Sequence, residues 1–494
     1  MNLHVLLDGL APPPPDHELA MLTVGGLVLD SRQVQTGDAF VALQGSQQHG
    51  LHHAAQAIAQ GAAVILYDPA GEGAALAAAI SAVPLWALDG LDVRLGEIAA
   101  RFYGQPSRQM AVIGITGTNG KTSCSQFLAQ LLTDCGIIGT LGWGSWGQLL
   151  ATANTTPDAL AVQRMLASLQ YQGKQAVAME VSSHGLAQGR VNGVAFTGAV
   201  FTNITRDHLD YHGTMAAYLD AKLLLLKQPG LAFAVINLDA EGSTRMLAET
   251  PEGVVRWGVT RQASRLAADE TLQVLDSHTH SAGLALTVAW RTFRTTVNIP
   301  LYGDFNAENV ALVLAVLLAM GEPFGQAVAK LASLQAVAGR MECFGGGAKQ
   351  PLVFVDYAHT PDALDNVLRS ARGHCRQALW AVFGCGGNRD AGKRPLMGAS
   401  AGQWADHVLV TDDNPRFEDS AAIIADILVG CKAGNTQVLA NREQAIRHAI
   451  SHASPQDCIV VAGKGHEDYQ EIKGVRYPFS DRQVVLAALA EREQ

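Results

Sequence analysis

A glycine-rich loop, Gly114-Ile-Thr-Gly-Thr-Asn-Gly-Lys-Thr122, lies between the predicted strand Ala111–Ile115 and the predicted helix Thr122–Asp134. Glycines let the backbone curl so that several N–H groups point at phosphate oxygens beside the positive end of a helix. Lys121 would then reach the outer phosphates, and the threonine hydroxyl next to it could ligate Mg²⁺. The standard phosphate-loop pattern has glycine where this chain has Ile115, so either a shorter phosphate loop or an ordinary glycine turn explains the sequence.

The order of strand, glycine turn and helix repeats along the chain. Ala176–Val181 and Ala232–Asn237 are predicted to be buried strands, and Ala307–Met320 a helix. This alternation predicts an α/β fold with a mostly parallel sheet between helices. A length of 494 residues suggests about three domains. We expect a smaller N-terminal α/β domain over 1–88, a central P-loop-type domain over 89–338 and a C-terminal Rossmann-like α/β domain over 339–494.

Composition excludes some classes of protein. The formal net charge is −10, which argues against a nucleic-acid binder but leaves room for a small anionic ligand held by a local basic cluster. No signal peptide is visible at the N-terminus, and the longest apolar run, Val310–Met320, is too short to cross a bilayer. Seven cysteines without a Cys-x-x-Cys motif suggest reduced thiols, and therefore a cytoplasmic protein.

Several polar residues of the middle region are candidates for metal binding or acid–base catalysis. Glu180 ends a predicted strand, where a carboxylate can face nucleotide-bound Mg²⁺. His208 and His212 stand four residues apart, and Lys222 lies beside an apolar run. The alternatives are a helix cap for Glu180, a polar loop for the histidines and a surface lysine for Lys222. Residue type alone favours these alternatives for all but Glu180.

Three motifs of the last region follow predicted strands. Gly384-Cys-Gly-Gly-Asn-Arg389 lacks the third glycine of a dinucleotide fingerprint and indicates a tight turn at a strand end. In Thr411-Asp-Asp-Asn-Pro-Arg416 the Asn-Pro pair fixes a turn, and Arg416 is suited to gripping a carboxylate. Val461-Ala-Gly-Lys-Gly-His-Glu467 is a further glycine loop that carries charge. Taken alone, the last two motifs are more often turns than binding sites.

Together these motifs resemble the Mur ligase family, the ATP-dependent amide ligases that build the peptide of bacterial cell-wall precursors. The resemblance covers most of the chain and explains Ile115, because this family uses the form Gly117-Thr-Asn-Gly-Lys-Thr122. The motifs that carry it, besides those quoted above, are Asp30-Ser-Arg32, Gly37-Asp-Ala-Phe-Val-Ala-Leu43, Asn154-Thr-Thr156, Met179-Glu-Val-Ser-Ser-His-Gly185, Thr205-Arg-Asp-His-Leu-Asp-Tyr-His-Gly213, Gly339-Arg-Met-Glu342 and Asp356-Tyr-Ala-His-Thr-Pro-Asp362.

The resemblance implies a role for each matching residue. It implies two Mg²⁺ ions held by Thr122, Glu180, His208 and a carbamoylated Lys222, with Lys121 also catalytic. ATP would contact Gly117, Thr118, Asn119, Gly120, Lys121, Thr122, Ser123, Asn306, Arg340 and Asp356. The uridine nucleotide would contact Leu29, Ser31, Ser46 and Gln47. The muramoyl dipeptide would contact Asn154, Thr155, Thr156, Ser182, Gln188 and Arg190. The incoming amino acid would contact Arg389, Asp413, Asn414, Pro415, Arg416, Gly463 and Glu467.

The resemblance also implies the reaction and its partners. Within the family, Asp413-Asn-Pro-Arg416 and Gly463-Lys-Gly-His-Glu467 resemble the member that adds meso-diaminopimelate to a UDP-N-acetylmuramoyl dipeptide through an acyl phosphate. We expect a monomer that neither binds nucleic acid nor inserts into a membrane. Two interpretations from other classes, and one from the same class of enzymes, stay open at this point. A P-loop phosphotransferase or nucleotide switch leaves the outer domains without a role, and a non-catalytic uridine-nucleotide-binding protein does not explain Glu180 with Lys121. Folylpolyglutamate synthetase shares the central fold, but Asp30-Ser-Arg32 and Arg416 speak against it.

Overall fold

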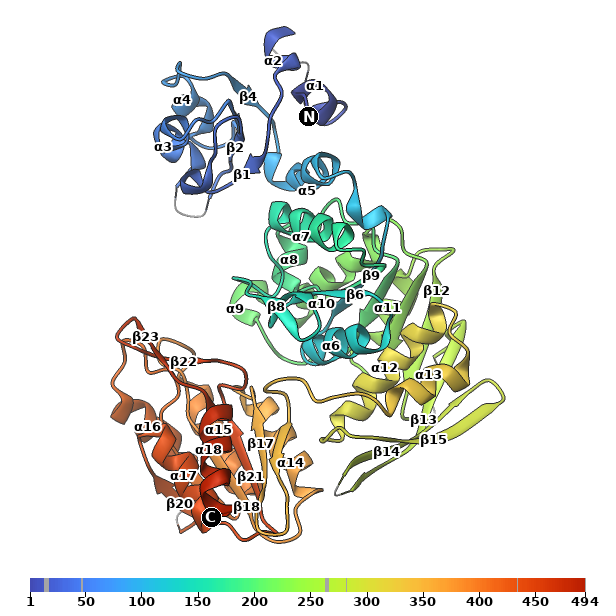
Figure 1. Cartoon of the computed structure of the whole chain (residues 1–494), viewed down its shortest axis with the longest axis vertical. Coiled ribbons are helices and arrows are strands. Elements are labelled where there is room, and N and C mark those ends of the chain that lie inside the picture. Colours follow the sequence, from blue (N-terminus) through green and yellow to red (C-terminus); the bar gives the residue numbers. More distant parts are fainter. Residues whose placement is uncertain (13–16, 46–47, 263–265, 281, 433, 494) are drawn as a thin grey trace. The chain divides into compact units, whose positions relative to one another are not determined.

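A computed structural model describes residues 1–12, 17–45, 48–262, 266–280, 282–432 and 434–493 (Figure 1). The chain forms two compact units. Unit 1 consists of Met1–Gly258 with Leu266–Glu270, and unit 2 contains the rest. Short 3-10 helices cover Ser31–Gln33, Gly50–His53, Pro106–Arg108 and Leu224–Lys227.

The N-terminal part of unit 1 is a small parallel sheet with helices on both faces. Its four strands run in the order β1 (Leu27–Val28), β2 (Ala39–Ala42), β3 (Val64–Tyr67) and β4 (Leu85–Ala87). One core cluster joins the sheet to α1 (Leu3–Leu7), α2 (His17–Met21) and α5 (Leu91–Phe102). The other face packs on α3 (Ala54–Ala59) and α4 (Gly73–Ala77). This confirms the smaller N-terminal α/β domain.

The central part of unit 1 is built on a mostly parallel sheet. Its strand order is β12-β11-β10-β5-β9-β6-β7-β8. The bounds are β5 (Ala111–Thr116), β6 (Cys135–Gly139), β7 (Gly142–Ser145), β8 (Gln148–Leu150), β9 (Ala176–Glu180), β10 (Gly198–Phe201), β11 (Phe233–Asn237) and β12 (Val255–Thr260). The helices are α6 (Lys121–Leu131), α7 (Ala159–Tyr171), α8 (Ser183–Ala187), α9 (Leu209–His212), α10 (Met215–Leu223) and α11 (Ser243–Glu249). The three predicted strands Ala111–Ile115, Ala176–Val181 and Ala232–Asn237 are all present, with β5 between β10 and β9.

Unit 2 contains an antiparallel ladder that was not expected from the sequence. It consists of β13 (Glu270–His280), β14 (Gly283–Trp290) and β15 (Phe293–Ile299). Two helices follow, α12 (Phe305–Ala319) and α13 (Phe324–Leu331). The apolar run Val310–Met320 accordingly lies in α12 and its cap, and is largely buried.

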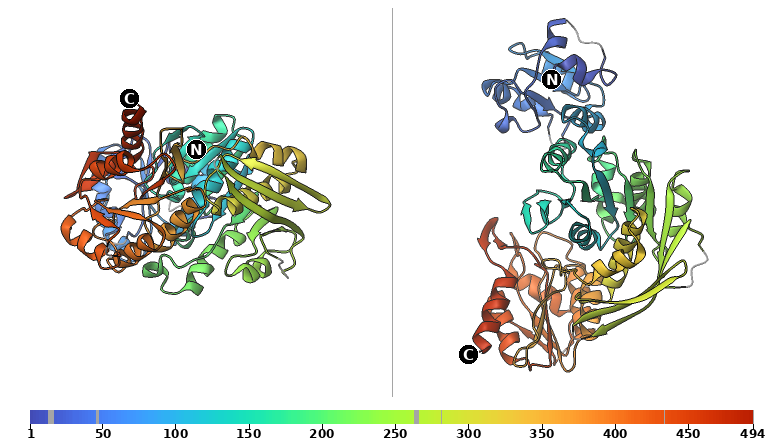
Figure 2. Two further views of the ribbon diagram at one scale, coloured as in Figure 1. Left: turned by 90° about the horizontal axis from the view of Figure 1, so that it is seen from below. Right: turned by 45° about the vertical axis from the view of Figure 1, so that its right-hand side comes forward.

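The C-terminal part of unit 2 is a six-stranded sheet in the order β16-β17-β21-β18-β19-β20. Only β16 is antiparallel to its neighbour, and the other strands pair in parallel. Core clusters place α14, α15 and α16 on one face and α17 and α18 on the other (Figures 1 and 2). The strands are β16 (Glu342–Gly345), β17 (Leu352–Asp356), β18 (Leu379–Phe383), β19 (His407–Val410), β20 (Thr436–Val438) and β21 (Cys458–Ala462). The helices are α14 (Pro361–Arg372), α15 (Lys393–Trp404), α16 (Ser420–Leu428), α17 (Arg442–His452) and α18 (Asp481–Glu493), and a separate hairpin joins β22 (Tyr469–Ile472) to β23 (Val475–Pro478).

The α/β fold in three domains is therefore confirmed. Among the described residues, no helix combines the length and the apolar character that a membrane span requires. All seven cysteines are free thiols.

Candidate active site

The glycine-rich loop joins the end of β5 to the start of α6. Gly117 has φ +146° and Gly120 has φ +85°, conformations that side chains rarely adopt. A Cβ atom on Gly117 would come within 1.9 Å of the Thr202 hydroxyl oxygen, so only glycine fits there. Ile115 lies inside β5 and is buried. The loop therefore starts after the strand, and its shorter form accounts for the missing glycine at position 115.

Residues after β10 hold this loop in place. The Asn119 amide donates to Asn203 Oδ1 at 2.9 Å, and the Thr202 hydroxyl donates to the Asn119 carbonyl at 2.5 Å. The Thr118 and Tyr218 hydroxyls lie 3.1 Å apart. These supporting residues could not be predicted, because nothing in the sequence indicates which distant segment faces the loop.

Two lysines converge on one carbonyl of the loop. Lys121 Nζ donates to the carbonyls of Gly117 and Thr118, each at 2.9 Å. Lys222 Nζ donates to the same Gly117 carbonyl at 2.8 Å and lies 4.5 Å from the Tyr218 ring centre. Lys222 is 1% exposed, so its interpretation as a surface lysine was wrong. Burial, followed by the nearby Lys121 charge, lowers the pKa of Lys222 well below its usual value.

The Glu180 carboxylate is fully buried at the end of β9. In the parallel pairing of β9 with β5, Glu180 lies opposite Ile115. Its Oε2 accepts from the Thr122 hydroxyl at 2.9 Å and from the Thr140 hydroxyl at 3.0 Å. Its Oε1 accepts from the Thr140 amide at 3.0 Å. Glu180 is therefore a strand-end carboxylate bound to the first turn of α6, where Ser123 is also buried, and the helix-cap alternative was wrong.

Histidines and tyrosines cluster beside α8, α9 and α10. His208 precedes α9 with φ +53°, and its ring centre lies 4.8 Å from that of His184. His212 Nε2 lies 3.0 Å from the Ser183 hydroxyl, and its ring centre lies 5.3 Å from that of Tyr218. Burial lowers the pKa of both His184 and His212. His208 is thus the N-cap of α9, and His212 is the last residue of the same short helix.

The donor set near the loop suits Mg²⁺, which takes oxygen ligands and usually one or two protein carboxylates plus substrate phosphates. Glu180 and Thr122 supply such oxygens side by side. Over the described ranges, no three His, Cys, Asp or Glu residues form a ready group of metal ligands. A metal held here would therefore depend on hydroxyl and phosphate oxygens as well as Glu180.

The residues expected at the muramoyl dipeptide lie around Glu180. The Thr156 hydroxyl donates to the Glu180 carbonyl at 3.0 Å and accepts from the Ser182 amide at 2.9 Å. Arg190 donates to the Thr156 carbonyl at 2.9 Å and to Gln188 Oε1 at 3.0 Å. The Thr155 hydroxyl lies 3.0 Å from the Thr140 hydroxyl, and Asn154 is exposed next to it. The structure therefore brings this predicted group together.

The predicted uridine-nucleotide residues are described only in part. The Ser31 hydroxyl is buried and donates to Gln56 Oε1 at 2.8 Å. Leu29 is half-buried just before it. Ser46 and Gln47 lie outside the described residues.

The residues of unit 2 that are predicted to contact ATP lie in two segments of the chain. The buried Asn306 amide donates to the Tyr302 carbonyl at 2.7 Å at the start of α12. Asp356 accepts from the amides of Met341 and Ala358 at 2.7 and 2.8 Å. Burial raises the pKa of Asp356, and the nearby Arg340 partly opposes this effect. Asp356 therefore fixes the loop that carries Arg340.

The residues of unit 2 that are predicted to bind the incoming amino acid follow three strands, β18, β19 and β21. Asp413, Asn414 and Pro415 are buried, and Arg389 is exposed. Arg416, with φ +52°, donates through Nη1 to the Gly387 carbonyl at 2.7 Å, and its Nε lies 3.6 Å from Glu471 Oε2. Arg416 is thus held between a loop carbonyl and the Glu471 carboxylate. A Cβ atom on Gly463 would come within 2.4 Å of Asp413 Oδ2, so the two loops touch.

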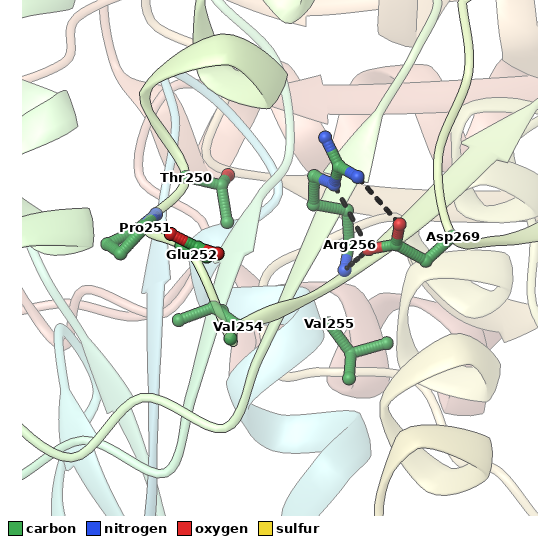
Figure 3. A pocket seen from close by; sticks show the side chains of 8 residues that line it. Thr250, Pro251, Glu252, Val254, Val255, Arg256 and Asp269 are labelled. Carbon is green, nitrogen blue, oxygen red and sulfur yellow. Dashed lines mark hydrogen bonds and ion pairs between the residues drawn. The ribbon is translucent and has the colours of Figure 1, made fainter.

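A surface hollow of about 450 Å³ lies elsewhere, at the start of β12 (Figure 3). It is lined by Thr250, Pro251, Glu252, Gly253, Val254, Val255, Arg256 and Asp269. Arg256 is paired with Asp269 at 2.7 Å. None of the predicted site residues lines this hollow.

Three family models match successive parts of the chain. The model described as "Mur ligase family, catalytic domain" matches residues 23–103, "Mur ligase middle domain" matches residues 115–317, and "Mur ligase, glutamate ligase domain" matches residues 339–465. The matches follow the N-terminal, central and C-terminal domains in order.

Individual relatives resemble the chain over its whole length. A Pseudomonas aeruginosa protein named UDP-N-acetylmuramoyl-L-alanyl-D-glutamate–2,6-diaminopimelate ligase is 49% identical over 478 residues, which are 96% of each chain. A solved structure of a protein with that name is 35% identical, with a TM-score of 0.73 and full coverage of both chains. The MurF ligase of Thermotoga maritima in complex with ADP shares the fold, with 18% identity, a TM-score of 0.64 and 95% and 98% coverage.

Proposed function

The chain belongs to the Mur ligase family of ATP-dependent amide-forming ligases, and we propose that it joins 2,6-diaminopimelate, in its meso form, to UDP-N-acetylmuramoyl-L-alanyl-D-glutamate. The name of the relative with 49% identity supports this choice of substrates. The observation that carries the chemistry is the buried bond between Glu180 and Thr122, beside the two lysines on the Gly117 carbonyl.

The proposed reaction has two steps. The glutamyl carboxylate attacks the γ-phosphate of ATP, so that the bond to ADP breaks and an acyl phosphate forms. The neutral amine of diaminopimelate then attacks the acyl carbon, phosphate leaves, and the nitrogen loses a proton as the amide forms. Both steps concentrate negative charge beside the glycine-rich loop, where Lys121 and the backbone N–H groups of Gly117–Thr122 would stabilise it.

We assign a metal-binding role to Thr122, Glu180, His208 and a carbamoylated Lys222, which would hold two Mg²⁺ ions. The ions would neutralise phosphate charge during transfer. Burial of Lys222 favours the neutral amine that reacts with CO₂, and the product would be an anionic oxygen ligand in place of an ammonium group. The bond between Glu180 and Thr122 supports the first part of this assignment.

The remaining site residues keep the roles that the family resemblance implies. Asn306, Arg340 and Asp356 would contact ATP, and the group around Thr156 and Arg190 would orient the dipeptide. We assign the uridine nucleotide to the domain over 1–88, catalysis to 89–338 and the amino acid to 339–494. Free thiols throughout the chain support a site of action in the cytoplasm.

Phosphate release tests the proposed function. We expect release from ATP only when the UDP-linked dipeptide is present, and full turnover only when meso-diaminopimelate is added as well. Lysine, D-alanine and D-glutamate serve as comparison substrates. Rapid ATP hydrolysis without any UDP-linked substrate would contradict the proposal and favour a nucleotide hydrolase.

Arg416 is expected to select the amino acid. Diaminopimelate carries a distal carboxylate that lysine lacks, and a guanidinium group can bind it through two parallel hydrogen bonds. Since one charged hydrogen bond contributes about 1.5–3 kcal/mol, Arg416→Ala should lower kcat/KM for meso-diaminopimelate about ten- to hundredfold. The value for lysine should change far less. Steady-state rates with both amino acids measure this preference.

A conservative variant of Arg416 and a control variant at a distant arginine accompany this measurement. Arg416→Lys keeps the charge but loses the two-pronged geometry, so it should be intermediate. Arg447→Ala removes an arginine that pairs with Glu443 and Glu491 on the surface, and it should leave the preference unchanged. An Arg416→Ala enzyme with the native preference would mean that another residue selects diaminopimelate.

A further inference from the structure

Lys464 is a buried lysine for which the proposed reaction has no role. It follows β21, and its side chain is fully shielded from solvent. A buried ammonium group is unfavourable unless charged or polar partners surround it. The groups that contact the Lys464 ammonium therefore indicate its role.

Lys464, Asn414 and Glu467 form a closed ring of hydrogen bonds. Lys464 Nζ donates to Asn414 Oδ1 and to Glu467 Oε2, each at 2.9 Å. Asn414 Nδ2 also donates to Glu467 Oε2 at 2.9 Å. The Asn414 oxygen accepts a further bond from the Glu471 amide at 2.9 Å. The side chain of Asn414 is thus largely occupied by protein partners.

This ring orients the Glu467 carboxylate. Both donors reach Oε2, and within the part of the chain that the structure describes no hydrogen bond or ion pair reaches Oε1. The Glu467 side chain is 16% exposed, whereas that of Lys464 is 0% exposed. The carboxylate therefore has one oxygen fixed from inside the domain and one available to a ligand.

The ring also sets the local charge. Asp413 is buried and its Oδ1 lies 3.9 Å from Lys464 Nζ, so one ammonium group faces two carboxylates. Without Lys464, Asp413 and Glu467 would lose the ammonium group that both of them face, and the remaining buried cation near them, Arg442, is already paired with Asp481 at 2.7 Å. With it, the group keeps one net negative charge, which suits a ligand that brings one ammonium group.

We propose that Lys464 is a positioning and specificity-determining residue, which fixes Glu467 so that Oε1 receives the distal ammonium group of the incoming amino acid. This inference rests on the proposed function, because it concerns the amino-acid site of the same reaction. It adds a supporting role for Asn414, which links Lys464 to Glu467 beside the amino-acid site.

Kinetics of Lys464→Met test the inference. The variant keeps the length of the side chain and removes the charge. We expect KM for meso-diaminopimelate to rise about ten- to hundredfold, because the loss of one charged contact has that effect on affinity. The maximal rate and the KM values for ATP and the UDP-linked dipeptide should stay near native. A merely structural role would instead lower the amount of active enzyme and leave every KM unchanged.

Three other variants make the result decisive. Lys349→Met removes an exposed lysine of the same domain and should behave as native. Lys464→Met combined with Glu467→Gln should be no worse than Glu467→Gln alone, since the two residues act as a unit. If Lys464→Met does not fold, Glu467→Gln alone carries the test: it keeps an acceptor for Lys464 and should raise only the KM for diaminopimelate.

The outcomes separate this inference from the proposed function. If the native chain does not ligate diaminopimelate, the proposed function fails. If the native chain ligates it and Lys464→Met has the native KM, the positioning role of Lys464 is overturned. A folded Glu467→Gln enzyme with the native KM would overturn it equally.

Discussion

Replacing Lys121 with alanine is expected to lower the rate of ligation by about a thousandfold, as for the loss of a donor that stabilises charge in the transition state. The ammonium group lies at the start of α6, within 2.9 Å of two loop carbonyls, where the phosphates of ATP would meet the positive end of the helix. The loss should appear in the maximal rate more than in the KM for the dipeptide. Phosphate release and formation of the UDP-linked tripeptide product measure it.

The fold should survive this substitution. Glycine geometry and the bonds from Asn203 and Thr202 hold the loop independently of Lys121. The circular dichroism spectrum should therefore match that of the native chain, with a melting temperature within a few degrees. Lys227→Ala, at an exposed lysine of the same unit, serves as the control. A Lys121→Ala enzyme with native turnover would remove the glycine-rich loop from the proposed chemistry.

Replacing Lys222 with alanine is expected to abolish most activity, by about a hundred- to a thousandfold if a charge-stabilising ligand is lost. Carbamoylation consumes the neutral amine and CO₂ and releases one proton, so its extent should rise with pH through the lowered pKa of Lys222. A small carboxylate such as formate or acetate should restore part of the activity of Lys222→Ala, because it fits the space that the side chain leaves.

Two observations separate carbamoylation from a purely structural lysine. Lys222→Met fills the same space without a donor or acceptor, so carboxylates should not rescue it. With ¹³C-labelled bicarbonate, the native chain should show a carbamate carbon signal that is absent from both variants. Native activity of Lys222→Ala, or no carbamate signal in the active native chain, would rule out the modification.

The parallel sheets could be predicted because their strands are short, buried apolar runs separated by glycine turns. The ladder of β13, β14 and β15 was missed for the opposite reason. In β13 buried and exposed residues alternate irregularly, and β15 contains Arg294 and two threonines, so no apolar run marks either strand. Partners in an antiparallel ladder supply burial that local sequence does not reveal.

Site residues that directly follow a buried strand could be predicted from the sequence, whereas residues whose burial depends on distant segments could not. Glu180 could be selected from its place after a buried strand, and it is buried beside the glycine-rich loop. The burial of Lys222 could not be seen, since it depends on Tyr218 and on a loop over one hundred residues earlier. The ligand assigned to each residue came from the family resemblance and stays a prediction.

The position of Glu180 has a consequence for how such a chain can vary in length. Glu180 reaches Thr122 because β9 pairs with β5 in one register, in which Glu180 lies opposite Ile115. Successive side chains of a strand point to opposite faces, so inserting or deleting one residue in either strand would turn the carboxylate away while the sheet persisted. Working variants can therefore gain or lose residues in surface turns such as 346–350, but not within these two strands.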